Sequence, residues 1–341
     1  MIISTNFTEY GIHSTGERWL WITYLLIVLL SSLIGDSIIL IATVRYNAIK
    51  LNKFLVVVMQ HIAVCDVLSS ITYVLPTMIS LIANRWILGD VIAYMQVYLE
   101  AFSFIGSNIL ICILTCIKLM LLKYPIKTRY KTTKNAHMTC ACAWMMAFLI
   151  PGIRLAFDNN GLSFSFIEYN INFGSPSEKS KAYHEIVVYT TYVFIVYIPT
   201  VIVIVTTFWI VVYLLKSRKV AKRTGSDQRW QGMVVVLTTA IVYSVSVIPG
   251  SVTFYIEVPH KTITRDRVVE SLVTLNIISN FYIYSLTIPS FRNFIRLNAW
   301  RTWGRLVQCI GQRDLPQDSI QLAQNLTPNL PTYRTQASHI L

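Results

Sequence analysis

Charged residues are scarce in this chain of 341 residues. They make up 13% of it, against about 25% in soluble globular proteins, while hydrophobic residues reach 54% and the mean hydropathy is +0.54. This composition excludes a disordered protein and disfavours a soluble enzyme. Acids are the scarcest charged type, so the net charge is +13. A nucleic-acid-binding protein would expose such charge over soluble domains, whereas a membrane protein carries it in basic cytosolic loops.

Patterns that carry catalysis or hold metals are also missing. The sequence has no internal repeat, no glycine-rich phosphate loop and no metal-ligand cluster, and its six histidines are scattered. Five of the six cysteines fall inside apolar stretches and none in a predicted outer loop, so no structural disulfide is expected. The sequence therefore does not indicate an enzyme, and we expect no cofactor beyond the ion considered below.

Long apolar stretches dominate what is present. A bilayer core about 30 Å thick is crossed by roughly 20 mostly apolar residues in a helix. Seven stretches meet this requirement: about Leu20–Val44, Phe54–Ile82, Ile92–Leu122, Ala136–Ala156, Ile186–Leu215, Met233–Ile256 and Val268–Ile288. The predicted fold is an all-α membrane protein, a bundle of seven transmembrane helices.

Basic residues set the orientation of this bundle. With the N-terminus outside, 21 of the 29 Lys and Arg residues fall on the cytosolic side. The predicted organisation is an extracellular N-terminus (1–19), a seven-transmembrane domain (20–288), an amphipathic membrane-surface helix (289–303) and a disordered cytosolic tail (304–341). The third cytosolic loop, Lys216–Arg229, is predicted to be short, about fourteen residues.

Two modification sites are candidates. Asn6 begins an Asn-Phe-Thr glycosylation triplet on the predicted outer side, and such triplets also occur by chance. Cys309 follows an arginine-rich stretch near the membrane, where it is either palmitoylated or an ordinary free thiol. The sequence leaves both pairs of alternatives open.

Several polar side chains are predicted at membrane depth, where ionisable groups are costly and are functional candidates by default. They are the acids Asp36, Asp66 and Glu100 and the uncharged residues Ser107, Asn276 and Asn280. If the helix faces that carry them converge, the bundle holds a polar cluster able to bind a small cation such as sodium. The alternative is a packing network of hydrogen bonds without an ion.

Glu100 and Lys118 mark the two ends of the third span. They are eighteen residues apart, which is five helical turns, so both face the same way. If that face is the bundle interior, Glu100 lines an outer cavity suited to a cationic ligand group, and Lys118 lines a cytosolic one. The alternatives are an internal salt bridge or a contact with lipid headgroups.

The chain from about Gly35 to Phe291 resembles the rhodopsin-like (class A) G-protein-coupled receptors. The landmarks in register are Ala63-Val64-Cys65-Asp66-Val67-Leu68, Trp86-Ile87-Leu88-Gly89, Lys118 with Pro125 seven residues later, Trp144, Pro199, Pro249, Asn280-Phe281-Tyr282-Ile283-Tyr284 and Phe291. The resemblance implies that Asp66 is the sodium-site carboxylate. It also implies that Phe291 starts the short membrane-surface helix.

Departures from the family pattern are equally specific. The family's Asp-Arg-Tyr reads Ile117-Lys118-Leu119, and Arg229 stands near the place of the opposing acid of span six, so the inactive-state ionic lock should not form. Four further positions differ: Asp36 replaces the span-one asparagine, Val247 the toggle tryptophan, Phe281 the proline of Asn-Pro-x-x-Tyr, and Ala93 the span-three cysteine. Two carboxylates near one site imply a shared proton or a bound cation.

The resemblance implies a receptor of the plasma membrane, of an orphan or chemosensory type, that passes a signal from an extracellular peptide or small molecule to a heterotrimeric G protein. Arrestin and membrane lipids are further expected partners. Ligand-binding candidates are Glu100, Ser103, Thr191 and Thr274, and candidates for G-protein coupling are Lys118, Pro125, Arg229 and Tyr284. The alternative is a seven-span receptor without signalling: a scavenger, a heteromer partner or a trafficking subunit.

Overall fold

The computed structural model describes residues 15–45, 52–124, 133–157, 162–165, 170–173, 193, 197–224, 227–255 and 263–299. The chain divides into two compact units, Met1–Arg292 and Asn293–Leu341, and each is considered by itself. The predicted glycosylation site Asn6, the predicted palmitoylation site Cys309, Pro125 and Thr191 all lie outside the described residues.

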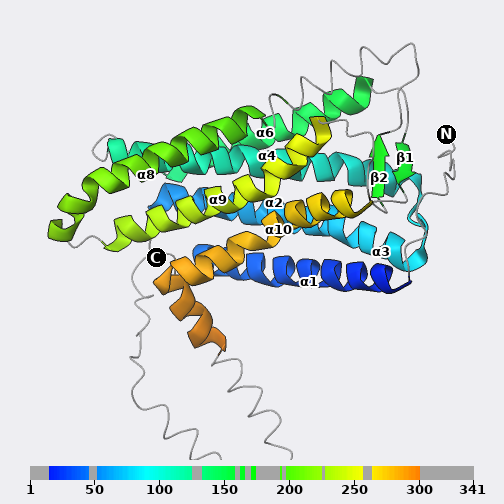
Figure 1. Cartoon of the computed structure of the whole chain (residues 1–341), viewed down its shortest axis with the longest axis horizontal. Helices are drawn as coiled ribbons and strands as arrows, with labels where there is room; N and C mark the ends of the chain where they lie inside the picture. The colour runs from blue at the N-terminus through cyan, green and yellow to red at the C-terminus, as the bar shows by residue number, and fades with distance from the viewer. Residues whose placement is uncertain are drawn as a thin grey trace, which may run out of the picture. The chain divides into compact units, whose positions relative to one another are not determined.

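Long helices make up the first unit (Figure 1). In chain order they are α1 (Thr15–Leu40) with the π-helical turn η1 (Ile41–Arg45), then α2 (Lys53–Ser69), η2 (Ser70–Val74) and α3 (Leu75–Ala83) in one run, α4 (Gly89–Lys123), α6 (Thr133–Phe157), α8 (Ile198–Thr224), α9 (Asp227–Tyr255) and α10 (Ile263–Thr287). The helix α4 packs against α2, α6 and α8, while α1 and α9 both pack against α10. Residues 289–299 are also helical.

Three helical stretches in the described part of the chain are long and apolar enough to cross a membrane, namely Thr15–Val44, Lys53–Ala83 and Gly89–Lys123. They coincide with the first three predicted spans. Shorter apolar helices cover Ile198–Tyr213 and Val234–Pro249, inside the predicted fifth and sixth spans. The remaining predicted spans correspond to α6 and α10.

Turn residues limit the helices at the predicted outer end of α3. Asn84 takes the left-handed conformation (φ 55°) that ends α3, as asparagine tolerates better than most residues. Trp86 then closes a short turn, because its indole Nε1 donates to the backbone oxygen of Gly89 at 3.1 Å. Gly89 itself has φ 79°, which requires glycine, and it begins α4.

The third cytosolic connection differs from the prediction. A loop over Lys216–Arg229 is wrong, because α8 continues to Thr224 and α9 already begins at Asp227. Most of this segment consists of Lys, Arg, Val and Ala, and long basic side chains favour helix while their charges reach water. The two helices therefore extend past the apolar stretches that marked the spans.

A two-stranded antiparallel hairpin between α6 and α8 was not predicted. Strands β1 (Leu162–Ser165) and β2 (Asn170–Phe173) pair in the register Leu162 with Phe173 and Phe164 with Ile171. Apolar and polar residues alternate along both strands, which is the period-two signal of a strand. That alternation could have identified the hairpin from the sequence.

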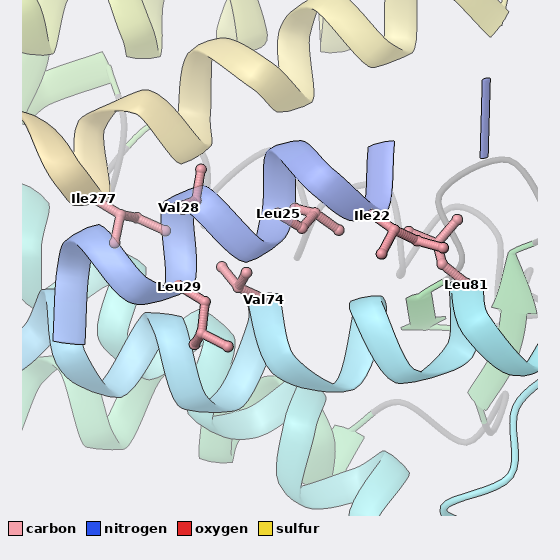
Figure 2. Close-up of a cluster of buried hydrophobic side chains, with 7 residues drawn as sticks. All are labelled: Ile22, Leu25, Val28, Leu29, Val74, Leu81 and Ile277. Carbon is pink, nitrogen blue, oxygen red and sulfur yellow. The ribbon is translucent and has the colours of Figure 1, made fainter. Parts of the chain in front are cut away.

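The first unit has an apolar core where α1 meets η2, α3 and α10. Figure 2 shows this cluster, whose members are Ile22, Leu25, Val28, Leu29, Val74, Leu81 and Ile277. Large apolar side chains are also exposed on the outside of the bundle, including Phe208 (62%) and Trp209 (53%) of α8. An apolar exterior of this kind suits a lipid environment, since lipid tails contact it without the cost that water would impose.

Candidate functional site

A buried polar network joins α1, α2 and α10. Asp36 of α1 is 1% exposed and Asp66 of α2 is 2% exposed. The Ser32 hydroxyl donates to Asp36 Oδ2 at 2.8 Å and lies 3.3 Å from the backbone oxygen of Asp66. From α10, Asn280 Nδ2 donates to Asp66 Oδ2 at 2.7 Å. The structure thus brings together three of the predicted site residues.

This network leaves several oxygen atoms without a hydrogen bond in the described part of the chain. They are Asp36 Oδ1, Asn280 Oδ1 and the nearby Tyr284 hydroxyl, all in buried positions. The predicted site residue Ser107 of α4 is also buried without a hydrogen bond, but within the described residues no hydrogen bond joins it to this network. Asp36 and Asp66 interact electrostatically with each other and with Tyr284. Carboxylate and amide oxygens are hard ligands, the type that small hard cations prefer. The donor set therefore fits a cation, and the two carboxylates supply the charge that a cation would balance.

Two residues at this site were missed from the sequence. Ser32 lies one turn before Asp36 on α1, and that spacing could have identified it. The second missed residue is Gly35, because a Cβ added there would lie only 2.6 Å from Cγ of Phe281.

Asn276, in contrast, was predicted to join the cluster. It is half-buried one turn before Asn280, and within the described residues its side chain does not join this network.

The predicted ligand-binding residues do not form one group in the structure. Glu100 of α4 is half-buried, and Ser103 is fully buried with its hydroxyl donating to the backbone oxygen of Leu99 at 2.8 Å. Thr274 is fully buried against α1, since its hydroxyl lies 2.7 Å from that of Tyr24. The Tyr24 hydroxyl also donates to the Ser271 backbone oxygen at 2.9 Å, so Thr274 belongs to a contact between α1 and α10.

At the predicted cytosolic side, the candidate coupling residues are buried where they are described. Lys118, near the end of α4, is 6% exposed, and Tyr284 of α10 is fully buried. Arg229 lies in the first turn of α9, and its side chain is outside the described part of the structure. Lys118 also makes interactions within the fold. A buried lysine at this end of α4 agrees with the prediction that its face of α4 is the bundle interior.

A comparison with protein families gives the decisive match. Residues 35–287 match the 7 transmembrane receptor (rhodopsin family) model, which is more than half of the chain. The chain belongs to the rhodopsin family of seven-transmembrane receptors. The predicted seven-span fold is thereby confirmed, and the buried network lies within the matched region.

One curated relative is the cysteinyl leukotriene receptor 1 of Sus scrofa. It is 21% identical over 192 residues, which cover 55% of this rhodopsin-family chain and 55% of the relative. The chain thus spans about half the length of the curated relative it matches. Both comparisons are with receptors, a generally non-enzymatic class. This agrees with the sequence analysis, which did not indicate an enzyme.

Proposed function

We propose that this rhodopsin-family protein is a plasma-membrane receptor that transmits the binding of an extracellular ligand to a heterotrimeric G protein. The observation that carries the proposal is the buried junction of Asp36, Asp66 and Asn280, with Tyr284 beside it. Hydrogen bonds between buried side chains of different helices are made or broken by small helix shifts, so such a junction has discrete arrangements. A ligand that prefers one arrangement shifts the balance between them.

The ligand in this proposal is a peptide or a small molecule that enters from the outer side. The half-buried carboxylate of Glu100 would attract a cationic group on such a ligand, because opposite charges attract strongly at low dielectric. The leukotriene in the name of the pig relative falls within the small-molecule part of this proposal. Glu100, Ser103 and Thr191 stay candidates for contact with this ligand.

A sodium ion is the proposed occupant of the buried network. Asp36 would hold it with its carboxylate oxygen that lacks a hydrogen bond, Asn280 with its amide oxygen, and Asp66 with its carboxylate. The ion would balance charge that these helices otherwise bury at a cost. Ser32 then acts by fixing the orientation of the Asp36 carboxylate.

The inner face is the proposed contact for the G protein. Lys118, Tyr284 and Arg229 would line it, with the basic ends of α8 and α9 beside them. The same basic side suits the anionic lipids of the inner leaflet. Arrestin is a further proposed partner on this side. Glycosylation of Asn6 and palmitoylation of Cys309 stay predictions.

The substitution Lys118→Ala tests this function. It should abolish most G-protein activation, because it removes the buried cation of the inner face, while surface expression stays within about twofold of the original. The matched control is Lys123→Ala, five residues later on α4, where the side chain is exposed. Activation of each of several G-protein classes is measured in cells at equal surface expression.

The outcome separates signalling from the alternative class. If Lys118→Ala and the unmodified receptor give the same second-messenger output in all G-protein classes, the chain is a non-signalling receptor such as a scavenger or a heteromer partner. If Lys123→Ala reduces output as much as Lys118→Ala does, the assignment of Lys118 to the coupling surface is wrong.

A further inference from the structure

A chain of three aromatic rings connects α2 and α6 and takes no part in the network described above. Trp144 Nε1 of α6 donates to His61 Nδ1 of α2 at 3.0 Å. His61 Nε2 in turn lies 3.3 Å from Nδ1 of His137, which is also on α6. The two histidine rings meet edge to face, with centroids 5.6 Å apart at an angle of 72°.

The indole fixes the position of both histidine protons. An indole N–H can only donate, so His61 Nδ1 must be unprotonated to accept from it. A neutral His61 then carries its proton on Nε2 and donates to His137 Nδ1. His137 must in turn carry its own proton on Nε2. The chain of hydrogen bonds therefore has one direction, from Trp144 through His61 to His137, and it exists only while both rings are neutral.

Adding one proton breaks this chain at either ring. A proton on His137 Nδ1 would place two N–H groups against each other across 3.3 Å, and a proton on His61 Nδ1 would oppose the indole N–H. Histidine is the side chain whose ordinary pKa, about 6.5, puts this change near physiological pH. His137 is exposed, and it lies four residues from the start of α6, about 6 Å along the helix.

Among the described residues around the pair, no carboxylate lies in position to stabilise the protonated form. His61 and His137 act electrostatically on each other. On α6 the titratable neighbours one turn from His137 are Lys134 and Cys140, and on α2 the neighbour is Cys65. Asp66, the acid of α2, points to the other side of its helix, where it contacts Asn280.

The helix α4, which packs against both α2 and α6, also presents no charge to the rings. Its Phe102 lies against Trp144, with centroids 5.0 Å apart, and its Gly106 lies against the Cys65 sulfur. Glu100 is two residues from Phe102, and this spacing turns it to the opposite side of α4. Within the described part of the chain, a positive charge on the pair would therefore lie one turn from Lys134 without a compensating acid.

We propose that Trp144, His61 and His137 form a proton-sensitive clamp between α2 and α6. The clamp is closed when both imidazoles are neutral and opens when either one takes a proton. Because α2 and α6 both begin on the predicted cytosolic side, acidification of the cytosol is the signal that opens it. The clamp does not depend on G-protein coupling, so its test is separate from the test of the proposed function.

The sign of the pH dependence follows from proton binding. The closed clamp cannot take up a proton without losing a hydrogen bond, whereas the unfolded chain can take one up, so the unfolded state binds more protons and stability rises with pH. On acidification the folding equilibrium constant should fall by up to about tenfold per pH unit for one proton excluded from the closed clamp. Above about pH 7.5 this contribution is constant.

The experiment uses the full-length receptor in lipid nanodiscs. Thermal unfolding is followed from pH 5.5 to pH 8 for the unmodified receptor, for a His61→Gln/His137→Gln variant, and for His260→Gln as the matched control. Glutamine keeps a donor and an acceptor but does not titrate. The unmodified receptor and the control should lose stability on acidification, and the double variant should lose clearly less.

Ring nitrogen NMR of histidine-labelled receptor tests the same clamp without requiring a stable variant. At pH 7.5 two histidines should show the neutral Nε2–H tautomer, and Trp144→Phe should change the signal of one of them. An Nδ1–H tautomer at His61, or an equal pH response in the double variant, overturns the proposal. So does stabilisation by Zn²⁺ that the double variant lacks, which would make the pair a metal site.

Discussion

Two carboxylates lie in the interior of one helical bundle, where burial of a charge is costly. Asp36 and Asp66 are each at most 2% exposed, and their hydrogen bonds come from the neutral donors Ser32 and Asn280. Neutral donors do not cancel negative charge, and two like charges in a medium of low dielectric repel strongly. The site is therefore expected to depend on a bound cation or a retained proton.

The substitution Asp66→Asn tests this expectation at the scale of the residue. It removes one charge without changing the shape of the side chain, so stabilisation by Na⁺ over a large organic cation should be lost. A cation at a hundred times its dissociation constant stabilises a fold by about 2.7 kcal/mol. Thermal unfolding in the two salts measures the difference. The control Asp90→Asn removes the same charge from an exposed position of α4 and should keep the effect. Asp66→Asn protein that still responds to Na⁺ contradicts the assignment.

The contact between α1 and α10 has no space for a side chain at one point. Phe281, which stands where the family has proline, packs so closely on α1 that a Cβ at Gly35 would lie 2.6 Å from its Cγ and 2.8 Å from its Cβ. Phe281 also meets Phe291 edge to face, with centroids 6.3 Å apart. Nearer the predicted outer end, the hydrogen bond between Tyr24 and Thr274 joins the same two helices.

The element-scale prediction is that Gly35→Ala separates α1 from α10. Overpacking of this kind costs about 1–3 kcal/mol, and the unfolding midpoint should fall accordingly. The control is Gly16→Ala on the same helix, where a Cβ meets nothing within 4 Å. Adding Phe281→Ala to the Gly35→Ala variant should restore part of the lost stability. Equal midpoints for Gly35→Ala and Gly16→Ala would show that Phe281 moves aside without cost.

At the scale of the whole molecule, the predicted topology gives this receptor a strongly basic inner face. By that topology the cytosolic side carries 21 basic residues and three acids, Asp227, Asp314 and Asp318. The acid that would restrain Lys118 in the inactive state is absent, and Arg229 stands near its partner position. Two cations at these positions would repel each other, and we expect that repulsion to remove one bias toward the inactive state.

We therefore predict that this receptor signals without a ligand. Second-messenger output should exceed that of vector-only cells, and Arg229→Glu should lower it because an acid opposite Lys118 restores attraction. The comparison is made at equal surface expression, with Arg218→Glu, a charge change in the adjoining part of α8, as the control. Output at the vector-only level with every G protein tested would contradict the prediction.

Much of the fold could be predicted because a membrane imposes simple rules on sequence. Apolar stretches of the required length and the bias of basic residues gave seven helices in the right places. Two features were harder, the hairpin of β1 and β2 and the cytosolic extensions of α8 and α9. Both lie beyond the apolar stretches that marked the spans, so a search for long hydrophobic segments does not find them, although the period-two alternation marks the hairpin.

Part of the candidate site was also accessible to the sequence. The cost of burying acids in a bilayer identified Asp36 and Asp66 before any contact was known. The absence of Asn276 from the network and the contact of Thr274 with Tyr24 were not accessible. These features depend on how far each helix is rotated about its axis, which helical spacing alone does not give.

What the sequence by itself determined is the class of molecule, its number of spans, its orientation and the residues too costly to bury without purpose. These follow from the free energy of transfer into lipid, which depends on the residues of each segment alone. Only the tertiary structure decided which partners those residues have. The hydrogen bond from Asn280 to Asp66 joins residues 214 positions apart. In the directed chain, Trp144 and His61 are 83 positions apart, and His61 and His137 are 76 positions apart. Such contacts are set by the packing of helix on helix, because the same apolar surfaces can pack in several rotations until side chains of definite size, such as Phe281 against Gly35, select one.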